Sequence, residues 1–193
     1  MHRIVAIVEG HAEVLAVPVL LRRLAGVLAP GLSLEVPHPI RVKRQKLVKP
    51  SELERTIELA GRKTTPSDGI LILLDSDQDC PKDLAAEIRG RAQAARPDRR
   101  IRVVLAKAEY EAWFLAAASS IAGTRGLAPG LSPPINPESI RDAKGWLSHR
   151  MTAGRSYRET LDQPAFSATF DLLSARTSGS FDKMWRDIAS LLK

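Results

Sequence analysis

The sequence has little cysteine and no long apolar run. Only one of its 193 residues, Cys80, is a cysteine, which excludes a disulfide framework and a zinc site built from four thiolates. No stretch approaches the roughly 20 apolar residues that cross a bilayer. The first ten residues lack the basic start, long apolar run and cleavage site of a signal peptide. We therefore expect a cytoplasmic protein that does not associate with membranes.

Acidic residues are outnumbered by basic ones. There are 29 Lys and Arg against 22 Asp and Glu, which gives a net charge of +7. This excess fits an anionic partner such as nucleic acid, and it equally fits a solvated surface that keeps the protein in solution. The length corresponds to one domain, or one domain with an appendage, and is sufficient to bury a core. Charge alone does not decide the partner.

Three short apolar runs predict strands that are buried on both faces. They are rich in β-branched residues and lie at 4–8, 70–74 and 101–106. A weaker strand is expected within 33–42. Helical patterns between these strands predict helices at 17–28, 51–61 and 81–96. This alternation predicts an α/β fold, with a mainly parallel sheet flanked by helices.

Local signals mark several helix ends. Ser51 and Glu54 have the spacing of a capping box at a helix start. Pro97 stops the helix that begins near Pro81. Pro18 predicts a late start or a kink in the first helix.

The chain changes character in its last third. Residues 123–137 are rich in Gly and Pro and predict a linker or wrapped loop, after which only helices are evident. Asn136 and Pro137 predict the cap and first position of one helix. An apolar stripe predicts the last helix, with Phe181, Met184, Trp185, Ile188 and Leu192 on one face. We therefore divide the chain into an α/β catalytic domain at 1–122 and a loop with a helical extension at 123–193 that packs on it.

Carboxylates follow three of the predicted strands. Glu9 and Glu13 follow the first, Asp75, Asp77 and Asp79 follow the run at 70–74, and Glu109 and Glu111 follow the run at 101–106. In open α/β sheets, ligands bind at the edge where parallel strands end. Acids gathered there require compensation, and hard oxygen ligands favour Mg²⁺ or Mn²⁺ over zinc. The pattern predicts a divalent metal site. The alternative is that these acids, Asp79 above all, lie at helix starts or flank turns.

Two other classes of protein place acids after strands. A phospho-accepting receiver domain carries two adjacent acids after its first strand, whereas here Glu9 is followed by Gly10. A haloacid-dehalogenase-like phosphatase carries its DxD motif on the first strand, whereas Asp75 and Asp77 follow a later one. The sequence disfavours both.

Basic residues lie beside the predicted acidic edge. Residues 41–49 carry five basic side chains, and a second basic stretch spans 89–102. As phosphate contacts they would give salt-dependent, sequence-independent affinity, and as solvated faces they would bind nothing specific. Gly10 permits a tight turn or close approach of a substrate. The candidate substrate-binding residues are Gly10, His11, Lys43, Arg44, Lys46 and Lys107.

The acids and their surroundings resemble a known family. Glu9, Gly10 and Glu13 form an EGxxE motif that, with the later pair Asp75 and Asp77, resembles the Toprim domain of topoisomerases, bacterial primases and OLD-type nucleases. Nearly the whole chain is similar to the family DUF4276. The similar segments are 8–13, 73–81, 108–116, 156–171 and 178–185.

The Toprim resemblance implies that Glu9 acts as a general acid or base, while Asp75 and Asp77 bind Mg²⁺. It further implies that Glu13, with Glu109 or Glu111, completes or orients the metal shell. A topoisomerase would also need a nucleophilic tyrosine on a separate DNA-gate domain, for which this chain has no room.

The function expected from these observations is Mg²⁺- or Mn²⁺-dependent hydrolysis of phosphodiester bonds in DNA or RNA. Relatives of the family include components of antiphage defence, which makes that context an expectation here. The alternative is a non-catalytic module that binds a metal or a nucleotide within a larger defence or repair complex. A partner ATPase and a homodimer are compatible with either function.

Overall fold

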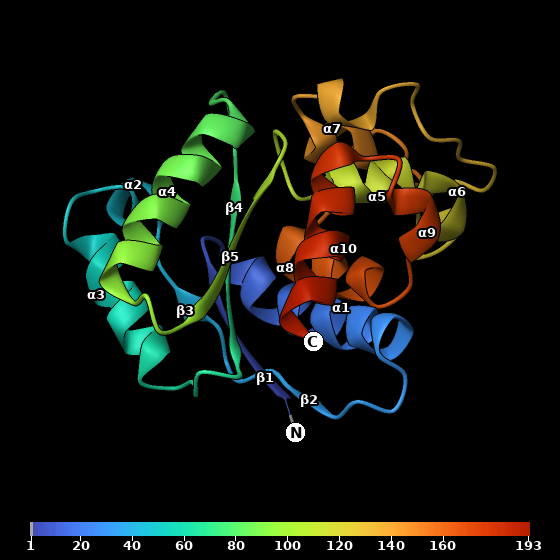
Figure 1. Cartoon of the computed structure of the whole chain (residues 1–193). Coiled ribbons are helices and arrows are strands. Elements are labelled where there is room, and N and C mark those ends of the chain that lie inside the picture. Colours follow the sequence, from blue (N-terminus) through green and yellow to red (C-terminus); the bar gives the residue numbers. More distant parts are fainter. Residues whose placement is uncertain (1) are drawn as a thin grey trace.

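The computed structural model describes residues 2–193 and shows a sheet between two groups of helices (Figure 1). Its strands are β1 (His2–Val8), β2 (Leu34–Glu35), β3 (Ile40–Arg41), β4 (Gly69–Asp75) and β5 (Arg100–Ala106). The order is β2-β1-β4-β5, with β3 pairing β1 further along the same edge as β2, and every pairing between these strands is parallel. This confirms the α/β fold with a mainly parallel sheet.

The register brings the ends of the long strands to one edge. In the pairing of β1 with β4, Val8 lies beside Leu73, and in the pairing of β4 with β5, Asp75 lies beside Ala106. The segments that follow these strands therefore leave the sheet side by side. β1 and β4 are neighbours, as a shared site between their ends requires.

Both faces of the sheet are buried, and successive strand residues alternate between them. Val5 and Ile7 belong to a core formed with the helices α2 (Arg44–Leu47), α3 (Glu52–Gly61) and α4 (Pro81–Ala95). Ala6 and Val8 belong to the core on the other face, formed with α1 (His11–Leu28) and the C-terminal helices. Burial on both sides explains why the strand sequences are continuously apolar.

The chain after residue 111 is mainly helical, and its helices after the loop at 123–137 were predicted. Its elements are α5 (Ala112–Ala116), α6 (Ala118–Ile121), η1 (Pro137–Ser139), α7 (Ala143–Ser148), α8 (Glu159–Ser167), α9 (Leu172–Ala175) and α10 (Gly179–Leu191). α8 packs along α1, and α10 packs on β5 and α1. The buried ring of Phe181 lies 5.3 Å from that of Trp113 and 5.5 Å from that of Phe170. Apolar residues before and after position 122 thus share one core; the domain boundary there stays a prediction.

The side-chain capping box expected at Ser51 does not form, although α3 begins at Glu52, directly after Ser51, as predicted; the start expected at Asn136 was wrong. Ser51 has a positive φ of 65° and its hydroxyl donates to the Pro50 carbonyl, so it does not cap α3. The carboxylate of Glu54 instead accepts from Arg91 at 2.9 Å. A 3₁₀ turn stands where we expected a helix from Asn136, and α7 begins only after Asp142, whose carboxylate accepts from the Gly145 N–H at 2.8 Å. At Glu54 a partner distant in sequence thus takes the place of the expected local cap.

Two further predictions need correction. The strand expected within 33–42 is split into β2 and β3, both short and both beside β1. Of the two alternatives for Pro18, the late start is wrong, because α1 begins at His11 and Ala12 and Ala16 are already buried against the core; Pro18 lies inside the helix, and the kink stays a prediction. None of the helices in residues 2–193 has the length and apolar character needed to cross a membrane.

Candidate functional site

Hydrogen bonds join the loops that follow β4 and β5. The buried Ser76 accepts from the Ala108 N–H through its hydroxyl at 3.0 Å and donates its own N–H to the Ala106 carbonyl at 2.8 Å. The Tyr110 N–H donates to Asp75 Oδ1 at 2.8 Å. Ala108 has a φ of 63°, a left-handed conformation that is strained for a residue with a Cβ. The contacts between the two loops hold this strained turn in place.

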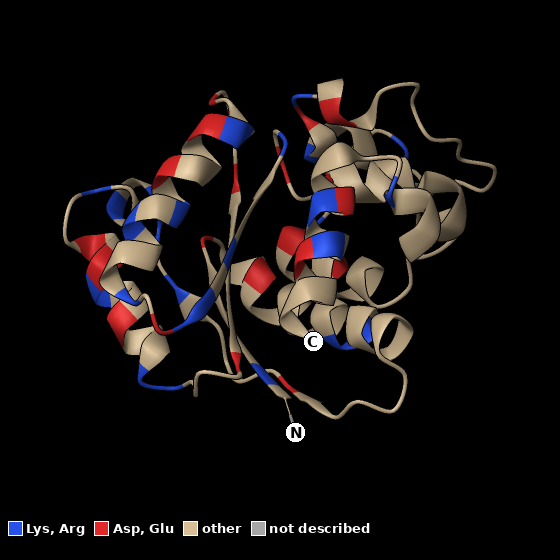
Figure 2. Ribbon diagram, in the orientation of Figure 1, with Lys and Arg blue, Asp and Glu red and all other residues tan. Residues whose placement is uncertain are grey.

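These loops, the end of β1 and the start of α1 surround a cavity of about 290 Å³, called the acidic cavity below. Its lining residues are Glu9, Gly10, Glu13, Asp75, Asp77, Glu109, Lys144 and Glu159. The structure therefore brings together five of the predicted metal ligands, from three strand ends. Figure 2 shows acidic segments at the end of β4 and at the start of α1. The lining has far more acidic than basic side chains.

The electrostatic effect of this crowding appears in the pKa values. Burial raises the pKa of Glu13 to about 7, and the charges of Glu111 and Glu9 add to the effect. Burial, together with the charges of Glu13 and Glu111, raises the pKa of Asp75 well above its usual range. Burial also raises the pKa of Glu9. These carboxylates repel one another and would be stabilised by a cation.

A lysine supplies part of that compensation. Lys144 Nζ lies 3.1 Å from Glu159 Oε2. Burial acts to lower the pKa of Lys144, but the charges of Glu111, Glu159 and Asp75 outweigh burial and raise it. Lys144 is therefore positively charged at neutral pH, and it stands among the acids that a divalent cation would contact.

Behind the cavity lies Glu111, whose side chain is completely buried and does not line the cavity. Its Oε1 accepts from the Tyr157 hydroxyl at 2.8 Å and from Gln163 Nε2 at 3.0 Å, whereas Oε2 has no hydrogen-bond partner among the described residues. Burial raises its pKa. Glu111 adds negative potential behind the cavity but, in this arrangement, cannot ligate an ion within it.

The side chain of Arg44 in α2 forms ion pairs with two of the predicted metal ligands. One guanidinium nitrogen lies 2.6 Å from Asp77 Oδ2, and a second contacts Asp79. Asp79 lies outside the acidic cavity, against a neighbouring pocket beside α4. Asp77 lines the cavity but turns toward Arg44. Arg44, expected to contact substrate phosphate, thus neutralises acids of the loop after β4.

Glu109 has a partner of its own. Its Oε2 accepts from the Ala143 N–H at 2.9 Å and from the Lys144 N–H at 3.2 Å, at the start of α7. This carboxylate therefore positions α7 and, with it, the Lys144 side chain. Glu109 in this structure thus has the alternative role considered for these acids, which is to lie at a helix start.

The donor set fits a hard divalent cation in its chemistry, because the cavity is lined by carboxylate oxygens with unfavourable mutual repulsion. Within residues 2–193, however, no three His, Cys, Asp and Glu side chains form a group that could hold a metal ion in their present arrangement. Glu9, Asp75 and Asp77 would hold one only after their carboxylates turned toward one another, with Asp77 released from Arg44. The metal site stays a prediction.

Most of the predicted substrate contacts lie around this cavity. His11 and Lys43 line a pocket of about 520 Å³ that shares Glu9, Gly10 and Glu159 with the acidic cavity. Lys46 is exposed on α2. Lys107, also exposed, lines a different groove between α4 and α10.

The sequence analysis missed Lys144 and Glu159, which both line the acidic cavity. Glu159 lies within the segment 156–171, which carries part of the family resemblance, so a signal for it existed. Lys144 had none, because it reaches the cavity only through the packing of α7 against the loop after β5.

The fold and the site together define a parallel α/β protein with an acidic cavity at the C-terminal edge of its sheet. The chain belongs to the family described as Domain of unknown function (DUF4276), whose model matches residues 8–189. This match covers both the strand-end acids and the C-terminal helices. No curated protein and no solved structure gives a significant match. The resemblance to Toprim domains stays a prediction.

Proposed function

We propose that this protein hydrolyses phosphodiester bonds of DNA or RNA with the help of Mg²⁺ or Mn²⁺. The observation that carries the proposal is the convergence of Glu9, Asp75 and Glu109 on one cavity, each from the end of a different parallel strand. The adjoining pocket with Arg41 and Lys43 places positive charge next to these acids. This combination suits a polyanion that is held by cations and cleaved at the acidic edge.

In this proposal Glu9, Asp75 and Asp77 hold the cation. Glu13 holds the lining of the cavity in place, because its carboxylate accepts a hydrogen bond from the Gly10 N–H. A bound Mg²⁺ supplies Lewis-acid chemistry that lowers the charge on the scissile phosphate. Glu9 exchanges a proton with the attacking or departing oxygen.

Cleavage of a panel of single-stranded DNA, duplex DNA and RNA tests the proposal, in Mg²⁺, in Mn²⁺ and in EDTA. We expect cleavage that requires the metal and is lost in Glu9→Gln and Asp75→Asn. The matched control is Glu52→Gln, the same change at an exposed acid on α3 outside the cavity. If both cavity variants cleave as well as the parent protein, the site is wrong.

A second candidate function is a non-catalytic module that binds a metal or a nucleotide within a larger defence or repair complex. This function is favoured because two of the acids already have protein partners. Asp77 forms an ion pair with Arg44, and Glu109 accepts a hydrogen bond from the start of α7. Mg²⁺ binding without cleavage, lost in Glu9→Gln and Asp75→Asn, would support this function. A cytoplasmic location, antiphage defence, a partner ATPase and a homodimer belong to the proposals for either function.

A further inference from the structure

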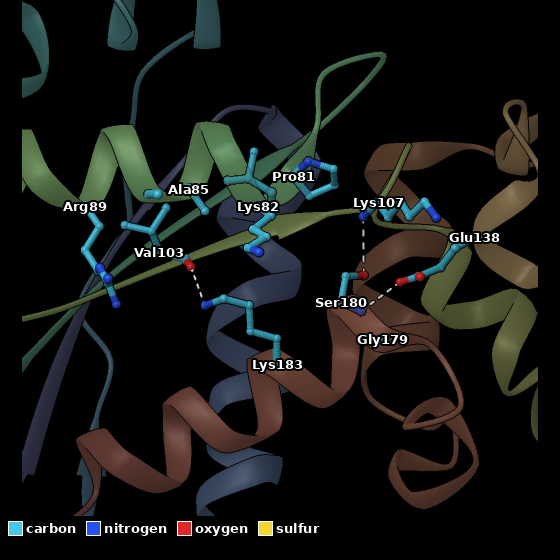
Figure 3. Close-up of a pocket in the computed structure, with 12 residues that line it drawn as sticks. Pro81, Lys82, Ala85, Arg89, Val103, Lys107, Glu138, Gly179, Ser180 and Lys183 are labelled. Carbon is cyan, nitrogen blue, oxygen red and sulfur yellow. Dashed lines mark hydrogen bonds between the residues drawn. The ribbon is translucent and has the colours of Figure 1, made fainter.

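A separate groove lies beside β5, on the side away from the neighbouring strand β4. This groove, of about 430 Å³, is bounded by α4 and α10 (Figure 3). Its floor is apolar, with Ala85, Val103 and Leu105. The volume falls within the roughly 300–1,000 Å³ of typical ligand pockets. Neither the fold nor the acidic cavity requires a groove here.

Three of the cations that line the groove are free to bind a ligand. Within residues 2–193, Lys82, Arg89 and Lys107 make no ion pair. The groove also holds one carboxylate, Glu138, whose Oε1 accepts from the Ser180 N–H at 2.8 Å and from the Ser178 hydroxyl at 2.6 Å; these neutral donors orient it toward α10 and leave its charge, which the three cations outnumber. Three unpaired cations around an apolar floor favour a ligand that carries both negative charge and an apolar surface.

The sequence of α4 directs these charges to one face. Lys82, Ala85 and Arg89 share a face by helical spacing and line the groove. The acids of the same helix, Asp83 and Glu87, line the pocket on the side of α2. On that side Glu87 and Glu54 are paired with Arg91, whereas the face of α4 toward the groove carries only cations among its charged side chains.

The edge of β5 in this groove is not available to another strand. The Val103 carbonyl accepts from Lys183 Nζ at 2.7 Å, and the Lys107 N–H donates to the Ser180 hydroxyl at 3.3 Å (Figure 3). These backbone groups would otherwise pair with an added peptide strand. Because side chains of α10 already occupy them, the groove favours a ligand recognised through its charge and its flat surfaces over a peptide.

The groove and the acidic cavity share no lining residue, but two segments of the chain lead from one to the other. Lys107 lines the groove, and Glu109, two residues further along the same loop, lines the acidic cavity. The loop after β4 also connects them, since Asp77 lines the cavity and Lys82 the groove. A strand that contacts Lys107 in the groove would therefore end close to Glu109 of the acidic cavity.

We propose that the groove binds a single strand of nucleic acid, with phosphates on Lys82, Arg89 and Lys107 and a base on the apolar floor. This inference rests on the proposed function and names the form of its substrate. A base can lie on an apolar floor only when it is unpaired, which selects a single strand over a duplex.

The test is fluorescence anisotropy of the full chain with a labelled single-stranded 12-nucleotide DNA, in EDTA so that no cleavage occurs. With three phosphate contacts, the affinity should fall about 20-fold between roughly 50 and 200 mM salt. Arg89→Glu should weaken binding by about tenfold or more and lower the salt slope by about 0.7. Lys82→Glu should act in the same way. Both residues are exposed, so the fold should tolerate either change, which circular dichroism would verify.

The matched control is Lys63→Glu, the same charge change at an exposed lysine near the opposite edge of the sheet. It should bind as the parent protein does. Equal losses in Lys63→Glu and Arg89→Glu would reduce the effect to net charge and overturn the inference. Tighter or equal binding of a duplex, or of an abasic strand of the same length, would also overturn it. The inference would also be overturned if the protein bound an oligoglutamate peptide in a way that depends on Arg89, while its binding of DNA did not depend on Arg89.

These outcomes are separate from those of the cleavage assay. Binding in EDTA that depends on Arg89, with no cleavage in Mg²⁺, would leave the groove in place and refute the hydrolytic function alone. Metal-dependent cleavage that is equal in Arg89→Glu, Lys82→Glu and the parent, with equal binding, would refute the groove alone.

Discussion

Lys144 gives the sharpest test of where a cation would bind. Its ammonium lies 3.1 Å from Glu159 and shares the acidic cavity with Asp75 and Glu9. A divalent cation held by those acids would be repelled by this lysine. We predict that Lys144→Gln, which removes the charge and keeps a polar side chain, tightens Mg²⁺ binding.

The magnitude follows from Coulomb's law. The Lys144 side chain is only 35% exposed, so the dielectric constant of water gives the smallest repulsion to expect. A unit charge about 6 Å from a divalent ion then costs about 1.4 kcal/mol, which corresponds to a tenfold change in the dissociation constant. The same substitution removes the ion pair with Glu159 and should lower the free energy of unfolding by about 1 kcal/mol. That loss corresponds to roughly 2–4 °C in Tm.

Isothermal titration calorimetry with Mg²⁺ measures the first effect, and thermal unfolding in EDTA measures the second. Lys63→Gln is the control, because it removes the charge of an exposed lysine outside the cavity. If the parent protein binds Mg²⁺ and Lys144→Gln binds it no more tightly, the cation does not lie beside Lys144 and our reasoning about the cavity fails.

Three further predictions concern the site and the core. Gly10→Ala should abolish cleavage without unfolding the protein, because its Cβ would lie 2.6 Å from the Glu13 carboxylate and displace it; comparing activity with circular dichroism checks this. Burial acts to raise the pKa of Asp68, but hydrogen bonds from Thr65 and the Arg3 N–H outweigh it and hold the pKa below the usual 3.8. Its contribution to stability is therefore complete above about pH 4 and lost as the pH falls through the folded pKa, and Asp68→Asn should flatten this part of the acid unfolding curve. Phe181→Ala should lower the free energy of unfolding by about 3–5 kcal/mol in urea, in one transition for the whole chain, and two separate transitions would contradict a shared core.

The strands could be predicted because both faces of the sheet are buried. Residues such as Ile7 and Ile72 must be apolar whichever side they face, so the sequence carries continuous runs that only a covered parallel sheet explains. The helix starts were harder to predict. The local pattern at Ser51 matched a cap, yet Arg91, distant in sequence, binds the Glu54 carboxylate that the cap needed.

The candidate site, too, could be predicted from the sequence only in part. Glu9 and Asp75 were found because parallel strands deliver their ends to one edge, a consequence of topology that spacing reveals. Glu111 follows the same strand as Glu109, but it directly precedes α5 and is completely buried. Glu109 lines the cavity and Glu111, two residues later, is buried in the interior. The spacing of acids in the sequence does not distinguish the two positions.

The sequence by itself determined the parallel α/β fold, the helical C-terminal extension and the edge at which the acids gather, since these depend on periodic burial and on the direction of strands. Only the tertiary structure decided which charges face one another. Lys144 enters the acidic cavity, Arg44 binds Asp77, and the cations of α4 line a groove beside β5. The physical reason is that side-chain partners are chosen by the packing of elements that are distant along the chain, and electrostatic interactions between them depend on distances of a few ångströms.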